Sequence, residues 1–315
     1  MKTLPLLVSA VLVALPILPA RAEMPRRLDF VRVDDPPRTL VLNALGDRLA
    51  TLTDGARTAV FRGPARTFAE PEVTTATVTT QEWVRVAPAQ WRVDGEKDPV
   101  LRRWLENALT DRSPDVLDIS MQYRRNTPDL RDDKGIRYAG RAFFGPLVDG
   151  ERLSDADFND YLGVSWTYDN GVVRPADTIR KDSLDCSGYL RMVFGYRSGF
   201  PLGWAPSRFR LPRQARDFTS GAPGAVIVAD TGTRPSDEQL ERLQTGDVLA
   251  FDLDPADGPL LDHSAIYLGV DSEGRPRFIS SRKTYNSVTM GDKYGASVLT
   301  GDGVLAKAFR LVRRV

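Results

Sequence analysis

The numbers of cysteine and histidine residues constrain the possible folds of this chain most: among its 315 residues there is one of each, Cys186 and His263. A single cysteine excludes an internal disulfide. One cysteine and one histidine also cannot supply the ligands of a structural zinc site or of a three-histidine catalytic site. We therefore predict a chain without a metal or other cofactor, whose fold is held by hydrophobic cores.

The first 22 residues have the pattern of an export signal. Lys2 precedes an apolar stretch from Leu4 to Leu18, and Ala20-Arg21-Ala22 supplies a small-X-small cleavage site. We predict that residues 1–22 are a signal peptide and that the mature protein is secreted, either extracellular or associated with the cell wall. The apolar stretch is short and interrupted by proline, so no stable membrane association is expected after cleavage; an uncleaved anchor is the alternative.

The charge balance argues against a nucleic-acid partner. The chain has 43 Lys and Arg against 42 Asp and Glu, and loss of Lys2 and Arg21 with the signal leaves 41 against 42. Proteins that bind nucleic acid usually carry a basic excess. We therefore expect no nucleic-acid partner, and nothing in the sequence points to an oligomeric state.

Cys186 lies at the start of a predicted helix. Apolar residues follow it at helical spacing: Leu190, Val193 and Phe194. Gly199 is a stop signal that limits the helix to about three turns, and Ser183 or Asp185 can cap its start. The backbone N–H groups of a first turn favour an anion, which would lower the thiol pKa from about 8.5 toward 7 or below. The same N–H groups can contribute to an oxyanion hole.

His263 opens a predicted strand at 263–269, and a second strand is predicted at 248–251. A histidine on a strand beside the cysteine helix can accept the thiol proton and return it to a leaving amine. The alternatives are a cysteine that is a small buried hydrophobic residue and a histidine that is a polar edge group. Both alternatives weaken because each residue is the only one of its type.

Three motifs follow one another in the C-terminal two thirds of the chain. They are Asp-Cys-Ser-Gly at 185–188, Leu-X-X-Gly-Asp at 243–247, and His263 with Ile-Tyr-Leu-Gly at 266–269. Their order and spacing resemble the NlpC-type family of bacterial cell-wall cysteine peptidases, over about residues 113–315. The resemblance implies a papain-like α+β catalytic domain with a central antiparallel sheet. It also implies that the Cys186 thiolate attacks an amide in peptidoglycan stem peptides, typically between D-glutamate and a diamino acid, and that the substrate is bound by Asp185, Ser187 and Gly188.

The family has a third catalytic position, often histidine, on the strand after the base. Here that strand is predicted at 277–282, and Ser280 occupies the matching place. A serine hydroxyl can accept the imidazole N–H bond, but it stabilises imidazolium less than a second imidazole would. A register slip of one residue would substitute Ser281, and a plain strand serine is the further alternative.

The segment ahead of the cysteine resembles the family's substrate loop. In it Trp166 matches the aromatic wall of the cleft, with ordinary core packing as the alternative. Residues 116–123 resemble the leading helix of the catalytic domain, so 124–160 is an insertion. A segment of that length usually forms a lid, a binding loop or a flap over a cleft.

The N-terminal part reads as a small β-rich domain over residues 23–96. Its predicted strands are separated by Gly, Pro and acidic turns: 58–61, 73–78 and 83–86. A helical linker at 97–112 follows, in which Asp98-Pro99 opens an amphipathic helix. The β-rich domain is either a wall-binding module or a scaffold that covers apolar surface.

The expectation from sequence is a secreted cysteine hydrolase of peptidoglycan stem peptides. Cys186 attacks, His263 serves as base and then acid, and Ser280 orients His263. One alternative is an N-acyl amidase or acyltransferase with the same dyad. A thiolate–imidazole pair indicates that an acyl group is transferred but does not determine which bond is cleaved. The other is a cell-wall-binding protein that has kept the fold but lost turnover, which a weak third residue would favour.

Overall fold

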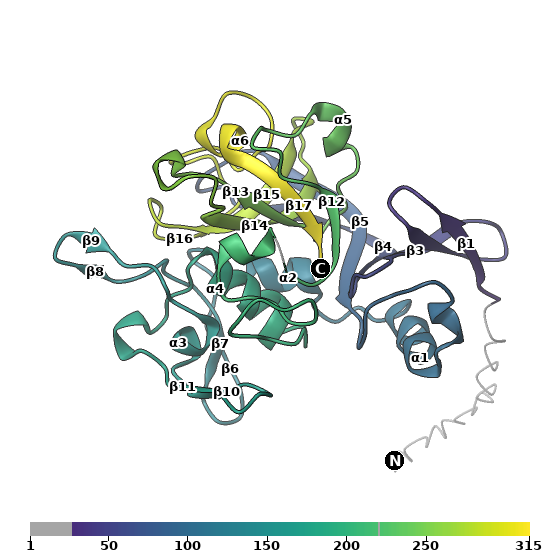
Figure 1. The fold of residues 1–315 in the computed structure, drawn as a ribbon, viewed down its shortest axis with the longest axis horizontal. Coiled ribbons are helices and arrows are strands. Elements are labelled where there is room, and N and C mark those ends of the chain that lie inside the picture. The colour runs from purple at the N-terminus through teal and green to yellow at the C-terminus, as the bar shows by residue number, and fades with distance from the viewer. Residues whose placement is uncertain (1–26, 220) are drawn as a thin grey trace, which may run out of the picture.

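The computed structural model describes residues 27–219 and 221–315. The predicted signal peptide at 1–22 lies outside the described residues. The fold combines antiparallel sheets with short helices, so the predicted α+β class is confirmed (Figure 1). Within the described part of the chain, no helix is long and apolar enough to cross a membrane.

An antiparallel sheet of five strands, paired in sequence order, forms the N-terminal part. The strands are β1 (Asp29–Val33), β2 (Arg38–Leu42), β3 (Arg48–Thr53), β4 (Thr58–Ala69) and β5 (Thr77–Val86). Helix α1 (Pro99–Ala108) packs on this sheet. The Trp104 ring lies edge-on to the Phe61 ring, with 5.7 Å between the ring centroids. Asp98 caps α1 by accepting the N–H groups of Val100 and Leu101, so the predicted helix is confirmed.

The central sheet has six antiparallel strands in the order β12-β17-β13-β14-β15-β16. Their bounds are β12 (Ala225–Val228), β13 (Val248–Phe251), β14 (His263–Val270), β15 (Pro276–Arg282), β16 (Ser287–Thr289) and β17 (Phe309–Arg314). The strands predicted at 248–251, 263–269 and 277–282 are therefore confirmed. In Figure 1 the central sheet lies above helices α2 (Val116–Met121) and α4 (Cys186–Leu190).

Two hydrophobic cores cover the two faces of the central sheet. Side chains alternate along β14, so Ile266 belongs to the core that contains α4, whereas Ala265 belongs to a second core with Phe251 and Phe278. Because both faces of β14 are covered, its first six residues are all buried. This alternation decides which side chains of β14 can face the cysteine helix.

The N-terminal sheet shares the first core with the rest of the protein. Val60 of β4 and Val84 of β5 lie in the same cluster as the α4 side chains. The buried carboxylate of Glu70, just after β4, accepts the hydroxyl of Thr289 and the N–H of Met290, each at 2.8 Å. These contacts join the N-terminal sheet to the edge strand β16.

The remaining elements are short. Among the described residues there are, besides short 3₁₀ turns, three further α-helices: α3 (Phe158–Leu162), α5 (Asp237–Leu240) and α6 (Val304–Ala308). Three two-stranded ribbons pair β6 (Leu130–Arg131) with β7 (Arg137–Ala139), β8 (Leu147–Val148) with β9 (Glu151–Arg152), and β10 (Trp166–Thr167) with β11 (Val173–Arg174). The first two lie in the segment 124–160 that is predicted to be an insertion. Figure 1 shows the β8–β9 ribbon extending away from the body of the molecule.

Candidate active site

Cys186 is the first residue of α4, which continues as a π-helical segment, Arg191–Tyr196, so the predicted helix of about three turns is confirmed. Asp185 is the cap, because its carboxylate accepts the N–H of Gly188 at 2.7 Å. A side chain at Gly188 is excluded by close packing, since an added Cβ would lie 2.2 Å from the carbonyl oxygen of Ala156. Gly188 therefore lets α4 pack against the segment before α3.

A buried network of charges anchors the start of α4. Arg213 pairs with the Asp185 carboxylate at 2.8 Å and donates to the Ser187 hydroxyl at 3.0 Å. Asp157 lies 3.6 Å from Arg213 and is paired with Arg191 of the π-helical segment at 2.9 Å. Arg213 comes from a loop with no helical or strand periodicity, so the sequence alone carried no signal for its role. The network fixes Asp185 and hence the orientation of the thiol.

The thiol is deeply buried rather than poised as an anion. Burial, with a smaller contribution from the Asp185 carboxylate, raises the pKa of Cys186 to about 12, although the N–H and hydroxyl of Ser264 and the charge of Arg213 act in the opposite direction. The prediction of a thiol pKa near 7 or below is therefore wrong for this structure. The favourable first-turn N–H groups do not compensate for the loss of water around a buried anion.

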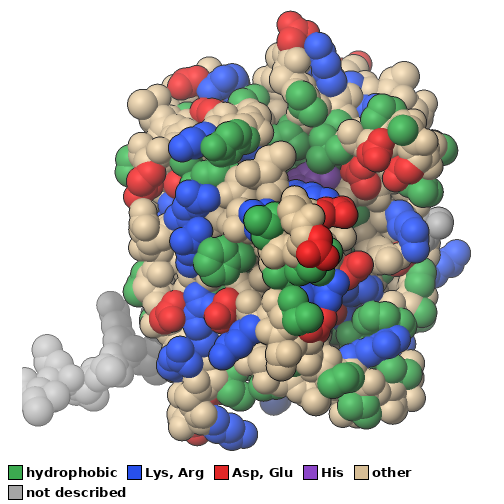
Figure 2. Space-filling view, turned by 90° about the vertical axis from the view of Figure 1, so that its left-hand side faces the viewer, with side chains coloured by type: hydrophobic (Ala, Val, Ile, Leu, Met, Phe, Trp, Pro, Cys, Tyr) green, Lys and Arg blue, Asp and Glu red, His purple; other side chains and the backbone are tan. Residues whose placement is uncertain are grey.

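His263 opens β14 as predicted, but no hydrogen bond joins it to Cys186 within the described residues. The thiol instead lies 3.7 Å from the carbonyl oxygen of Asp262, and alternation along β14 directs Ser264 toward α4. The His263 ring lies 5.6 Å from Phe251 of the second core, and its buried Nε2 has no hydrogen-bond partner in the described part of the chain. Figure 2 shows the single histidine, in purple, only as a small patch between hydrophobic and charged side chains.

The surroundings of His263 favour its neutral form. Burial, and then the guanidinium of Arg282 at the end of β15, lower the pKa of His263 to about 3. Arg282 is itself buried and bonds to neutral groups, among them the Ser297 hydroxyl, rather than to a carboxylate. A cation beside an imidazole opposes formation of imidazolium.

Ser280 and Ser281 point to different partners. The hydroxyl of Ser280 accepts a hydrogen bond from Nε of Arg282 at 3.4 Å. The hydroxyl of Ser281 donates to the carbonyl oxygen of Leu184 at 2.6 Å, next to the cap of α4. Neither serine hydrogen-bonds to His263 among the residues described, so Ser281 supports the cysteine helix and Ser280 lies beside Arg282.

The thiol lies in a pocket of about 200 Å³. Its lining includes Asp185, Cys186 and Ser187 from the start of α4, with Ser154 and Asp155 from the end of the 124–160 segment. The loop at 213–216 and the loop before β14 close the other sides, and His263 is not part of the lining. The pocket wall is therefore charged and polar beside the thiol.

Trp166 and Gly188, both predicted to bind substrate, lie outside this lining. Trp166 packs against the first core. Its ring lies edge-on to Phe158 and to Tyr196, with 4.9 Å and 6.1 Å between the ring centroids. Ring pairs of this kind stabilise a core by burial and by edge-to-face geometry. In this structure, Trp166 has the contacts of a core residue.

No family model matches the chain, and searches of curated proteins and of solved structures also found no match. Functional inference therefore depends on the residues and their geometry.

Proposed function

We propose that this protein is an exported cysteine hydrolase with a papain-like catalytic domain, which cleaves amide bonds in peptidoglycan stem peptides of the D-glutamyl–diamino acid type. The observation that carries the proposal is the place of Cys186. It is the first residue of a helix, it lines a polar pocket, and its helix packs on the strand that begins with the only histidine. Histidine is the commonest side-chain base in such reactions.

The reaction would form and cleave one thioester. The Cys186 sulfur adds to the amide carbonyl, while its proton passes to His263 and then to the departing amine. The N–H of Cys186 is a donor for the oxyanion. Water, deprotonated by His263, then displaces the sulfur and releases the acid.

This chemistry requires a change from the structure described above. Thiol and imidazole are both neutral and are not hydrogen-bonded to each other, and His263 lies on the face of β14 opposite Ser264. The backbone at the start of β14 therefore has to rearrange when substrate binds, so that His263 leaves Phe251 and approaches the thiol. Hydrogen bonds between catalytic groups often become short only in the substrate complex. The arrangement without substrate is therefore a resting state under this proposal.

A second candidate is a cell-wall-binding protein that has kept this fold without turnover. The specific observation in its favour is Arg282, whose charge opposes protonation of His263, together with a serine at the third position. A base with a pKa of about 3 has little capacity to hold a thiol proton at neutral pH.

The test is digestion of purified peptidoglycan with the protein lacking residues 1–22, beside Cys186→Ser and His263→Gln. The matched control is Arg103→Gln, which removes an exposed charge on α1. We expect the parent and the control to release stem-peptide fragments with new amino groups on the diamino acid, identified by mass, and the two site variants to release none. Fragments with new L-alanine N-termini would indicate amidase action instead. If all four proteins sediment with the wall and release nothing, the hydrolase is rejected in favour of the binding protein.

A further inference from the structure

The loop between β13 and β14, residues 252–262, forms one side of the thiol pocket. Four of its residues belong to the pocket lining: Asp257, Leu260, Leu261 and Asp262. The Cys186 thiol donates to the backbone carbonyl oxygen of Asp262, with 3.7 Å between sulfur and oxygen. A carbonyl oxygen that accepts a hydrogen bond from a thiol stabilises the neutral form and disfavours the thiolate, which is the reactive form. This β13–β14 loop therefore holds Cys186 in its unreactive state.

The side chain of Asp262 ties the end of the β13–β14 loop to its start. Its two carboxylate oxygens accept the backbone N–H groups of Leu253, at 2.9 Å, and Asp254, at 2.8 Å. The backbone N–H of Asp262 donates to the carbonyl oxygen of Phe251 at 3.0 Å. One residue thus supplies both the carbonyl oxygen that contacts the thiol and the carboxylate that fixes the loop in this position.

Few other interactions hold the β13–β14 loop. Residues 254–260 are all exposed, and residues 253–261 form no hydrogen bond or ion pair with any described residue outside the loop. Leu261, which is buried with Ala250 and Leu311, is the main apolar anchor. A segment with so few external contacts can open locally while the rest of the protein stays folded.

The acidic side chains of the loop oppose its closed position. Burial raises the pKa of Asp262, the N–H groups of Leu253 and Asp254 lower it, and the charges of Asp257 and Asp252 raise it again. The two hydrogen bonds therefore hold the Asp262 carboxylate in place against burial and against the repulsion of neighbouring carboxylates. This repulsion reduces the stability of the closed loop and favours local opening.

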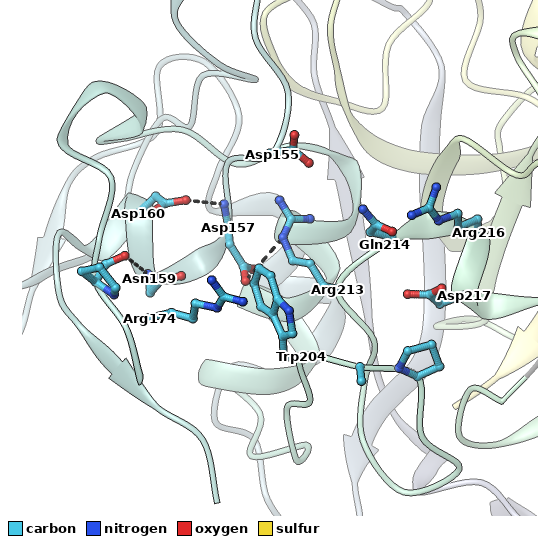
Figure 3. A pocket seen from close by; sticks show the side chains of 13 residues that line it. Asp155, Asp157, Asn159, Asp160, Arg174, Trp204, Arg213, Gln214, Arg216 and Asp217 are labelled. Carbon is cyan, nitrogen blue, oxygen red and sulfur yellow. Dashed lines mark hydrogen bonds and ion pairs between the residues drawn. The ribbon is translucent and has the colours of Figure 1, made fainter. Parts of the chain in front are cut away.

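Another side of the thiol pocket is fixed. It is formed by Arg213, which is buried, pairs with Asp185 at 2.8 Å and lies 3.6 Å from Asp157. Figure 3 shows the contact between Arg213 and Asp157 in a neighbouring cavity of about 520 Å³. That cavity shares four lining residues with the thiol pocket: Asp155, Arg213, Gln214 and Arg216. Of these two sides of the pocket, the β13–β14 loop is the one that can move.

We propose that the β13–β14 loop is an autoinhibitory segment, held closed by the Asp262 carboxylate, which covers the Cys186 thiol and keeps it protonated until a ligand in the pocket displaces the loop. Because the loop lines the pocket, such a ligand contacts it directly. A ligand that binds only the open form shifts the population toward that form. Opening also frees the backbone before His263, which has to rearrange in the proposed reaction. The inference rests on the proposed function only in taking Cys186 as the reacting group.

Alkylation of the single cysteine by iodoacetamide at pH 7.5 measures opening of the loop in the folded protein. Asp262→Ala removes both carboxylate hydrogen bonds and should raise the alkylation rate at least about tenfold, since one hydrogen bond to a charged group contributes enough for such a factor. Asp262→Asn has the same size but presents an amide N–H₂ to one of the two N–H groups. Its rate should lie between those of the parent and Asp262→Ala, which separates loss of the hydrogen bonds from loss of bulk.

The dependence of the rate on urea distinguishes local opening from global unfolding. Local opening exposes little surface, so the alkylation rate of the Asp262 variants should be nearly constant at urea concentrations below the unfolding transition. Asp132→Ala is the matched control. The Asp132 carboxylate also accepts two backbone N–H groups, those of Lys134 at 3.0 Å and Ile136 at 2.8 Å, but it does not line the thiol pocket. This control should be alkylated at the rate of the parent.

The proposal is overturned if Asp262→Ala or Asp262→Asn is alkylated at the rate of the parent, if Asp132→Ala is accelerated equally, or if the acceleration grows with urea as global unfolding does. These outcomes are separable from the catalytic proposal. A thiol that becomes reactive in the Asp262 variants, combined with no cleavage of peptidoglycan by any of these proteins, supports the autoinhibitory loop and rejects the hydrolase. Cleavage by the parent together with unchanged alkylation in the Asp262 variants rejects the autoinhibitory loop alone.

Discussion

Acidification should destabilise this protein through His263, and the size of the effect follows from its surroundings. Burial and Arg282 lower the pKa of His263 from 6.5 to about 3 in the folded protein. In the unfolded chain the imidazole titrates near its ordinary pKa of about 6.5. Between these two pH values His263 binds a proton in the unfolded state but not in the folded state. The stability contribution of His263 is therefore fully present above pH 6.5 and is lost as the pH falls toward 3.

The expected loss between pH 7 and pH 5 is about 2 kcal/mol, since each pH unit below 6.5 costs about 1.4 kcal/mol while the folded imidazole stays neutral. This figure does not depend on the precise folded pKa, provided that it lies well below 5. Other groups also titrate: burial raises the pKa values of Glu70, Asp118, Asp160 and Asp262. They stabilise the folded state as the pH falls, in the parent and in a His263 variant alike.

The assay is urea unfolding of the parent and of His263→Gln at pH 7, 6 and 5. The quantity compared is the difference between their free energies of unfolding at each pH, from which the contributions of the carboxyl groups cancel. The difference should shift by about 2 kcal/mol in favour of the variant between pH 7 and pH 5. Because the chain has one histidine, an NMR titration of its ring protons in untagged protein reads the folded pKa directly. Equal pH dependence in parent and variant, or a ring that titrates near 6.5, would refute the reasoning.

Three further outcomes follow from the contacts around the site. Cys186 in the folded protein should react with iodoacetamide at pH 7.5 at least about tenfold more slowly than in urea, because burial raises the pKa of the thiol to about 12 and hinders access of the reagent. A reaction rate that levels off near pH 7 would show a preformed thiolate instead. Arg282→Met should raise the pKa of His263 only in part, because burial is the larger cause, and the same NMR titration measures it; no change would show that the two side chains do not interact. Arg213→Met should lower the free energy of unfolding, measured by urea titration, by about 3–5 kcal/mol, because it leaves the Asp185 carboxylate buried without its cation. A loss below about 1 kcal/mol would show that water replaces the guanidinium.

Local patterns in the sequence predicted the elements around the site. The helix after Cys186, its possible cap at Asp185 and the strand beginning at His263 all depend on residues close together in the chain, such as a capping carboxylate or an apolar repeat. The helix at Asp98-Pro99 was recognised for this reason too. The α+β class was implied by the resemblance of the three motifs to the NlpC-type family.

Tertiary structure decided the chemistry of these residues. The sequence indicated a thiol in a first helical turn, but only packing determined that its pKa is raised, because burial of Cys186 depends on distant segments such as the one that brings the carbonyl oxygen of Asp262 to 3.7 Å from the sulfur. Register between β14 and its neighbours set which side chain faces α4, and a shift of one residue reverses that choice. The thiol pocket likewise joins the start of α4 to the loop at 213–216 and to the loop before β14, so its lining could be recognised only once the chain was folded.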